Sequence, residues 1–213
     1  DGNAVHTLYA IKAGSAWVQS DGSLGVDPVY QTRGVWGSRT VSGLAKYTSY
    51  SFQVQAMNSE DILTDLGPAA TAMTRELDLP TGTLIIDGDA EYATTTSVTL
   101  TLSASDLTSG VEKMRFSNDG TTWIPADWAS ALAYATSYPW ILSSGDGVKT
   151  VYVQYRDVAG NVSVDTISDT IKLDQNPPTG TLNINTGAAY TTSTSVTLNV
   201  SASDPGSGVA KMR

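Results

Sequence analysis

The sequence predicts an all-β protein, a tandem series of small β-sandwich units in an extended array, and three observations lead to this fold class. Residues 80–115 recur as residues 178–213 without a gap, and 24 of the 36 aligned positions are identical. A repeat of about 98 residues indicates whole domains, since solenoid units are shorter. Apolar and polar residues alternate with the period of two that strands show, and turn residues separate these stretches at short intervals.

The composition excludes several classes of protein. The net charge is −9 and lysine and arginine together number 12, so no basic face is available for nucleic acid. Cysteine is absent, which excludes disulfides and thiolate metal sites. No apolar run is long enough to cross a bilayer and no signal-peptide pattern follows Asp1, so we expect no membrane span in this segment.

Residues 1–78 form the first expected unit. Around Tyr50, apolar and polar residues alternate, which predicts a strand buried on one face. Residues 43–58 resemble the later part of a fibronectin type III domain, with Tyr50 in the position of that family's tyrosine corner. The resemblance implies that residues 7–12 are the third strand of that fold. Residues 1–78 would then be a partial domain that lacks the first two strands.

Two short connectors that contain proline, residues 76–80 and 174–178, separate the units. Proline fixes φ and restricts the residue before it, so we expect stiff connectors and an extended arrangement. The expected units are therefore 1–78, a complete sandwich at 79–176, and the first part of a second copy at 177–213.

Residues 79–176 predict about seven short strands separated by turns, the pattern of an immunoglobulin-like sandwich. The apolar residues of the expected strands fall on one face of each strand: Leu84 and Ile86; Val98, Leu100 and Leu102; Met114 and Phe116; Val151, Val153 and Tyr155. The stretches 109–111, 118–123, 145–153 and 156–163 resemble bacterial immunoglobulin-like repeats. Such repeats occur in large cell-surface and secreted proteins, so the resemblance implies an extracellular location rather than an activity.

Residues 177–213 contain two expected strands and the start of a third. Nothing in this chain is expected to close over their apolar face, which consists of Leu182, Ile184, Val196, Leu198 and Val200. An isolated pair of strands is marginal in water. We therefore expect either a longer parent chain or neighbouring copies that supply the missing strands. In the second case, strand sharing predicts a fixed oligomer or filament.

Candidate catalytic residues are few. The single histidine, His6, offers almost no basis for a Ser-His-Asp arrangement. Six aspartates of the 79–176 unit fall in expected turns, where a carboxylate bonds local backbone amides: Asp87, Asp89, Asp106, Asp119, Asp146 and Asp157. The sequence therefore favours a protein that is not an enzyme.

Calcium is the metal that the turn residues favour. Asp87 and Asp89 lie on an expected early loop of the 79–176 unit, and Asp157 and Asn161 lie on a late turn. Their oxygens are hard ligands of the kind that Ca²⁺ takes. In the second copy, residues 185–187 replace the first loop without any carboxylate. Turn acids without a metal therefore remain the alternative.

Five aromatic residues gather in residues 123–140, and aromatic faces can serve either a core or a sugar ring. Trp140 is followed by two aliphatic residues and is expected in the core. Trp128 stands beside Asp127 and is the exposed candidate for carbohydrate binding.

Two functions stay open at this point. The first is a non-catalytic structural or interaction segment of a long extracellular bacterial surface protein, such as a spacer, adhesin, surface-layer or filament component. Its partners would be other copies of itself, neighbouring domains or cell-surface glycans. The alternative is an accessory spacer or carbohydrate-binding region of a secreted carbohydrate-active enzyme.

Overall fold

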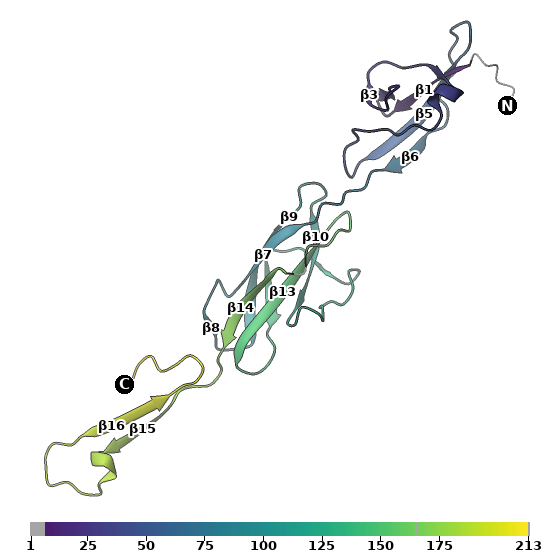
Figure 1. The fold of residues 1–213 in the computed structure, drawn as a ribbon. Coiled ribbons are helices and arrows are strands. Elements are labelled where there is room, and N and C mark those ends of the chain that lie inside the picture. Colours follow the sequence, from purple (N-terminus) through teal and green to yellow (C-terminus); the bar gives the residue numbers. More distant parts are fainter. Residues whose placement is uncertain (1–6, 165, 213) are drawn as a thin grey trace. The chain divides into compact units, whose positions relative to one another are not determined.

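The computed structural model describes residues 7–164 and 166–212 and divides the chain into two units, residues 1–78 and residues 79–213 (Figure 1). Nearly all regular structure is β, as predicted; the helical pieces are α1 (Arg33–Trp36) and the single turn η1 (Asn185–Gly187). Among the described residues, no helix has the length and apolar character needed to span a membrane. His6 lies outside the described residues.

The first unit is an antiparallel sheet with the strand order β3-β2-β1-β5-β6, in which β4 also pairs with β1. Its strands are β1 (Leu8–Ala13), β2 (Ala16–Val18), β3 (Leu24–Gly25), β4 (Gln31–Thr32), β5 (Ser49–Met57) and β6 (Ala70–Met73). Ala13, Val18 and Trp36 form its small core. The Tyr50 hydroxyl accepts a hydrogen bond from the Ala45 amide (2.9 Å), which is the contact of a tyrosine corner.

The second unit contains a two-sheet sandwich. One sheet has the order β12-β9-β7 and the other the order β11-β10-β13-β14-β8. The strands are β7 (Thr81–Ile86), β8 (Tyr92–Ala93), β9 (Ser97–Ser105), β10 (Val111–Ser117), β11 (Leu132–Ala133), β12 (Ser137–Ile141), β13 (Gly147–Asp157) and β14 (Ser168–Leu173). We call β7 and β9 the first hairpin; they share one sheet with β12. The strands β10, β11, β13 and β14 lie in the other sheet, together with the short β8. This division is that of an immunoglobulin-like sandwich.

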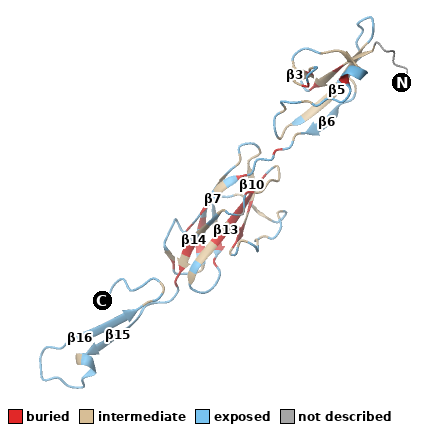
Figure 2. Ribbon diagram, in the orientation of Figure 1, coloured by how far each residue is buried: buried red, intermediate tan, exposed pale blue. Residues whose placement is uncertain are grey.

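The core of the sandwich lies between the two sheets (Figure 2). In β9, Val98, Leu100 and Leu102 are buried while the residues between them are exposed, so the predicted alternation is confirmed. Phe116 of β10 is fully buried. Its ring stacks on Tyr138 with centroids 5.2 Å apart and is tilted against Trp140 at 5.4 Å. Trp140 is therefore a core residue, as predicted.

After the sandwich, β15 (Thr179–Ile184) and β16 (Leu198–Ser203) pair with each other as a two-stranded sheet. Every residue of both strands is exposed (Figure 2). The turn that follows β16 is tied back to the sandwich, because the Ser207 amide donates to Asp174 Oδ2 (2.6 Å) and Lys172 Nζ donates to the carbonyl oxygen of Gly206. We call β15 and β16 the second hairpin.

Candidate functional site

The structure places the four candidate calcium residues in two groups. Asp87 and Asp89 follow the C-terminal end of β7. Asp157 ends β13, and two residues before it the Tyr155 hydroxyl donates to the carbonyl oxygen of Thr83 (2.8 Å), near the start of β7. The two groups therefore lie at opposite ends of a strand about 20 Å long and do not meet.

Asp157 and Asn161 are brought together, and they build a turn. The Asp157 side chain is completely buried. Its Oδ1 accepts from the Asn161 amide (2.7 Å) and its Oδ2 from Asn161 Nδ2 (2.8 Å). The amide of Val158 donates to the carbonyl oxygen of Gly110 (3.1 Å) and connects this turn to the neighbouring one. The carboxylate thus has a local structural task of the kind that aspartate performs in turns.

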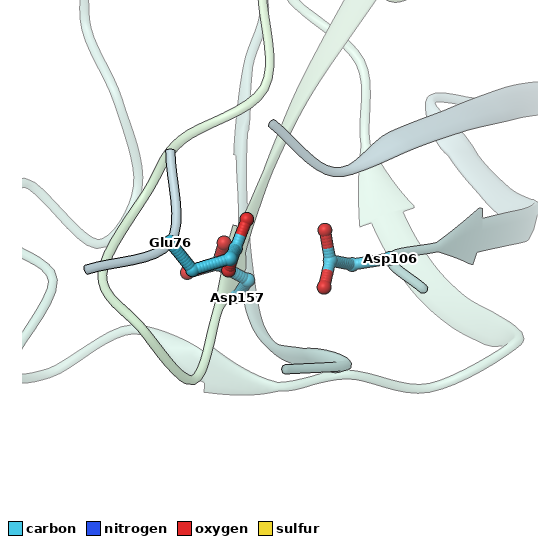
Figure 3. A group of neighbouring side chains, drawn as sticks. All are labelled: Glu76, Asp106 and Asp157. Atoms are coloured by element: carbon cyan, nitrogen blue, oxygen red, sulfur yellow. The ribbon is translucent and has the colours of Figure 1, made fainter. Parts of the chain in front are cut away.

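A second acid, Asp106, lies beside Asp157. One carboxylate oxygen from each lies within 4.8 Å of the other (Figure 3). Asp106 Oδ1 accepts from the amides of Ser109 (2.8 Å), Gly110 (3.0 Å) and Thr108 (3.1 Å). We call Asp106 and Asp157 the acid pair. Both members belong to the second unit.

Glu76 is also drawn in Figure 3 but belongs to the first unit and is not counted in the pair. Burial acts to raise the pKa of Asp106, but the amide bonds from Ser109, Gly110 and Thr108 outweigh it and lower the pKa. Asp106 was not among the expected calcium residues. Its one sequence signal is that the repeat retains it as Asp204.

The chemistry of the acid pair is that of two close negative charges, which a cation would stabilise. Ca²⁺ takes six to eight oxygen ligands, more than this pair offers. At the other end of the sandwich, Asp87 Oδ1 accepts from the Thr99 amide (2.6 Å) and so closes the loop of the first hairpin. Calcium binding by Asp87, Asp89, Asp157 and Asn161 therefore stays a prediction.

Trp128 lies in the loop that joins β10 to β11 and is half-buried. The guanidinium carbon of Arg115 lies 4.5 Å from its ring centroid, and that of Arg156 lies 6.0 Å away. The same Arg115 carbon is 5.1 Å from the ring of Trp123. These are cation–π distances, so arginine side chains from the sheet hold the loop against β10 and β13.

Hydrogen bonds fix this arrangement. Arg115 Nε donates to Gln154 Oε1 and Arg115 Nη1 to the carbonyl oxygen of Ala126, both at 2.8 Å. Lys113 Nζ donates to the carbonyl oxygen of Trp128 (3.0 Å). A guanidinium already covers part of the Trp128 ring that a sugar would need. Carbohydrate binding at Trp128 stays a prediction, and the contacts seen are structural.

The first unit has a shallow groove of about 290 Å³, close to the lower limit for small-ligand sites. Its lining is mostly apolar and contains no carboxylate: Tyr9, Ile11, Arg33, Trp36, Gly37 and Val54. The groove therefore offers neither paired acids nor a nucleophile with a neighbouring base.

Asp119 lies near the start of the loop that contains Trp128, and its electrostatic contribution to the stability of the sandwich can be tested. Its Oδ1 accepts from the amides of Thr122 (2.6 Å) and Thr121 (2.7 Å) and from Ser117 Oγ (2.8 Å), and these bonds hold the pKa of Asp119 far below its usual range. A lowered pKa stabilises the fold above the unfolded value of about 3.8 and the stabilisation is lost as the pH falls below it.

We expect Asp119→Asn to lower the urea midpoint of the sandwich at neutral pH and to have a smaller effect in acid. The measurement is hydrogen exchange at the amides of β13 in increasing urea, at several pH values. Asp89→Asn is the matched control, because asparagine also tolerates the positive φ of 70° found there. Equal destabilisation by Asp119→Asn at neutral and acid pH would contradict the assignment.

The fold and these sites together define an all-β protein with an immunoglobulin-like sandwich in its second unit. No family description matches the sequence, and no curated protein matches it either. Among solved structures, the chain is similar to fibronectin(III)-like modules of CbhA from Clostridium thermocellum. The TM-score is 0.36 and the identity 15%, over 81% of this chain and 80% of that chain. A likeness at this level does not identify a family.

Proposed function

We propose that this chain is a non-catalytic structural segment of a long extracellular bacterial surface protein, where it acts as a spacer between other domains or as part of an adhesin, surface layer or filament. Its partners would be neighbouring domains or other copies of the chain. The acids that sequence motifs singled out support this proposal, because Asp87, Asp106, Asp119 and Asp157 all accept hydrogen bonds from nearby groups in turns.

The observation that carries the proposal is where the chain enters and leaves the sandwich. It enters at Thr81, which pairs with Ser105, and leaves at Leu173, which pairs with Gly147. Because the Tyr155 hydroxyl bonds Thr83 near the far end of β13, these two points lie at opposite ends of the sandwich. Such a unit suits a connection in series.

A second feature resists pulling along the chain. The short strand β8 pairs with β14 in parallel, so tension on the C-terminal end of the sandwich pulls β14 along β8 instead of peeling it away. The Lys172 amide donates to the carbonyl oxygen of Glu91 (3.2 Å) and the Asp174 amide to that of Ala93 (2.9 Å). Both of these hydrogen bonds must break at the same time when β14 is pulled along β8.

Single-molecule force spectroscopy on the full chain tests the proposal. We expect one unfolding event for the sandwich, with a gain in contour length of about 300 Å. Lys172→Pro removes the amide that bonds Glu91 and is expected to lower the rupture force. Lys172→Ala keeps that amide and is the control. A sandwich that extends without a resolved unfolding event would contradict a role in resisting force.

The alternative, a carbohydrate-binding accessory region, has its own readout. Binding to a glycan array that is lost in Trp128→Ala and retained in Trp123→Ala would favour it. The rupture-force experiment does not depend on this result, so the two proposals are tested separately.

A further inference from the structure

The second hairpin presents an apolar face to solvent. Between 48% and 57% of each of these side chains is exposed: Leu182, Ile184, Val196, Leu198 and Val200. The first hairpin, β7 and β9, carries the same pattern, but there the exposure is 6% or less: Leu84, Ile86, Val98, Leu100 and Leu102. Corresponding side chains thus form a buried core in one copy and an exposed surface in the other.

The two hairpins have the same strand register. Leu84 pairs with Leu102 and Leu182 with Val200, while Ile86 and Ile184 each pair with a leucine. The loops are closed by equivalent bonds as well. The Thr99 amide donates to Asp87 Oδ1 (2.6 Å), and the Thr197 amide donates to Asn185 Oδ1 (2.8 Å). The second hairpin therefore already has the conformation in which the first is docked, which lowers the cost of binding.

The structure shows which surface covers the first hairpin. It is the sheet of β10, β13 and β14, whose inward side chains complete the core: Met114, Phe116, Val151, Val153, Tyr155, Ile171 and Leu173. These are large apolar residues on alternating positions of three adjacent strands.

Three polar contacts add specificity to this docking. The Tyr155 hydroxyl donates to the carbonyl oxygen of Thr83 (2.8 Å), and the Ile86 amide donates to Asp169 Oδ2 (2.8 Å). The Ala104 amide donates to the Tyr134 hydroxyl (2.9 Å). On the hairpin side, all three use backbone atoms. The second hairpin offers the same atoms at Thr181, Ile184 and Ala202.

One shape requirement is also retained. A Cβ atom at Gly82 would lie 2.5 Å from the carbonyl oxygen of Ser103 in its own hairpin and 2.6 Å from Cε2 of Tyr155, so glycine serves both the strand pairing and the packing of that ring against β7. The second hairpin keeps glycine at the corresponding position, Gly180, although there a Cβ would meet only backbone and Ala202 of its own hairpin. Gly180 thus leaves room for a tyrosine ring that the second hairpin does not contact.

We propose that the apolar face of the second hairpin is a docking surface for a β-sheet of the β10–β13–β14 kind, supplied by a polypeptide with the residue pattern of 106–176. The apolar side chains, the backbone hydrogen-bonding atoms and the glycine all match such a sheet. The inference goes beyond the proposed function, because it holds equally for a load-bearing spacer and for a sugar-binding region.

The test attaches residues 116–176 after Arg213, because residues 204–213 already correspond to residues 106–115, and compares hydrogen exchange by mass spectrometry in this fusion and in the full chain. We expect the amides of β15 and β16 to become at least about tenfold more protected in the fusion. Leu198→Asp places a charge on the docking face and should abolish the protection. Asn199→Asp adds the same charge at the next position, on the opposite face, and should leave it unchanged.

Three results would overturn the proposal. One is the absence of added protection, and another is equal protection in the Leu198→Asp variant. The third is protection that rises with the concentration of the full chain alone, which would mean that a second copy covers the face.

Discussion

Replacing Phe116 with alanine is expected to lower the free energy of unfolding of the sandwich by about 3–5 kcal/mol. Phe116 is completely buried, and its ring contacts both Tyr138 and Trp140 across the core. Truncation removes apolar area from the core and leaves a cavity between two aromatic rings, which cannot collapse without moving β12.

The chain has two compact units, so we do not expect a signal from the whole chain to report a single two-state transition. The stability of the sandwich is therefore measured by hydrogen exchange at the amides of β13 in increasing denaturant. Ile141→Ala is the control, because Ile141 neighbours Trp140 but is 60% exposed, and its loss is expected to stay within about 0.5 kcal/mol. A loss below about 1 kcal/mol for Phe116→Ala would contradict the packing described.

The second prediction compares two leucines that follow the same three residues. Leu100 and Leu198 both follow Ser-Val-Thr, but Leu100 is fully buried and Leu198 is 57% exposed. Leu100→Ala is expected to lower the free energy of unfolding of the sandwich by about 2–5 kcal/mol. Leu198→Ala is expected to change it by about 0.5 kcal/mol or less.

The same exchange measurement reads out both variants. Leu198 lies outside the sandwich, so Leu198→Ala is the control for an effect of the same substitution that does not involve the core. A loss below about 1 kcal/mol for Leu100→Ala would contradict its burial against the opposite sheet.

Much of the fold could be predicted because the residue patterns that determine it lie within short stretches of the sequence. The alternation in β9 and β13 determines which side chains face inward, and turn residues separate the strands. The gap-free repeat indicated a unit of about 100 residues before any contact was known. The repeat comparison also predicted an exposed apolar face on the second hairpin, and the exposure of its side chains confirms this.

The candidate sites were harder to predict because they depend on contacts between distant residues. Asp106 and Asp157 are far apart in sequence and meet only because β9 ends where β13 ends. Asp87 and Asp157 share a chemistry but fall at opposite ends of the sandwich. Trp128 is flanked by polar and small residues, yet Arg115 of β10 covers its ring, and no local pattern reports that contact.

The shortness of the connector 174–178 has a consequence for folding fidelity. In the sequence, two similar hairpins precede and follow the strands β10, β13 and β14, and the wrong hairpin could compete for their sheet. To replace the first hairpin, β15 would have to start beside Asp157, whereas the connector leaves from the level of Gly147, roughly 34 Å away along β13. Six Cα-to-Cα steps span only roughly 20 Å. The tether thus excludes misassembly within a single molecule, although the repeated sequence alone would permit it.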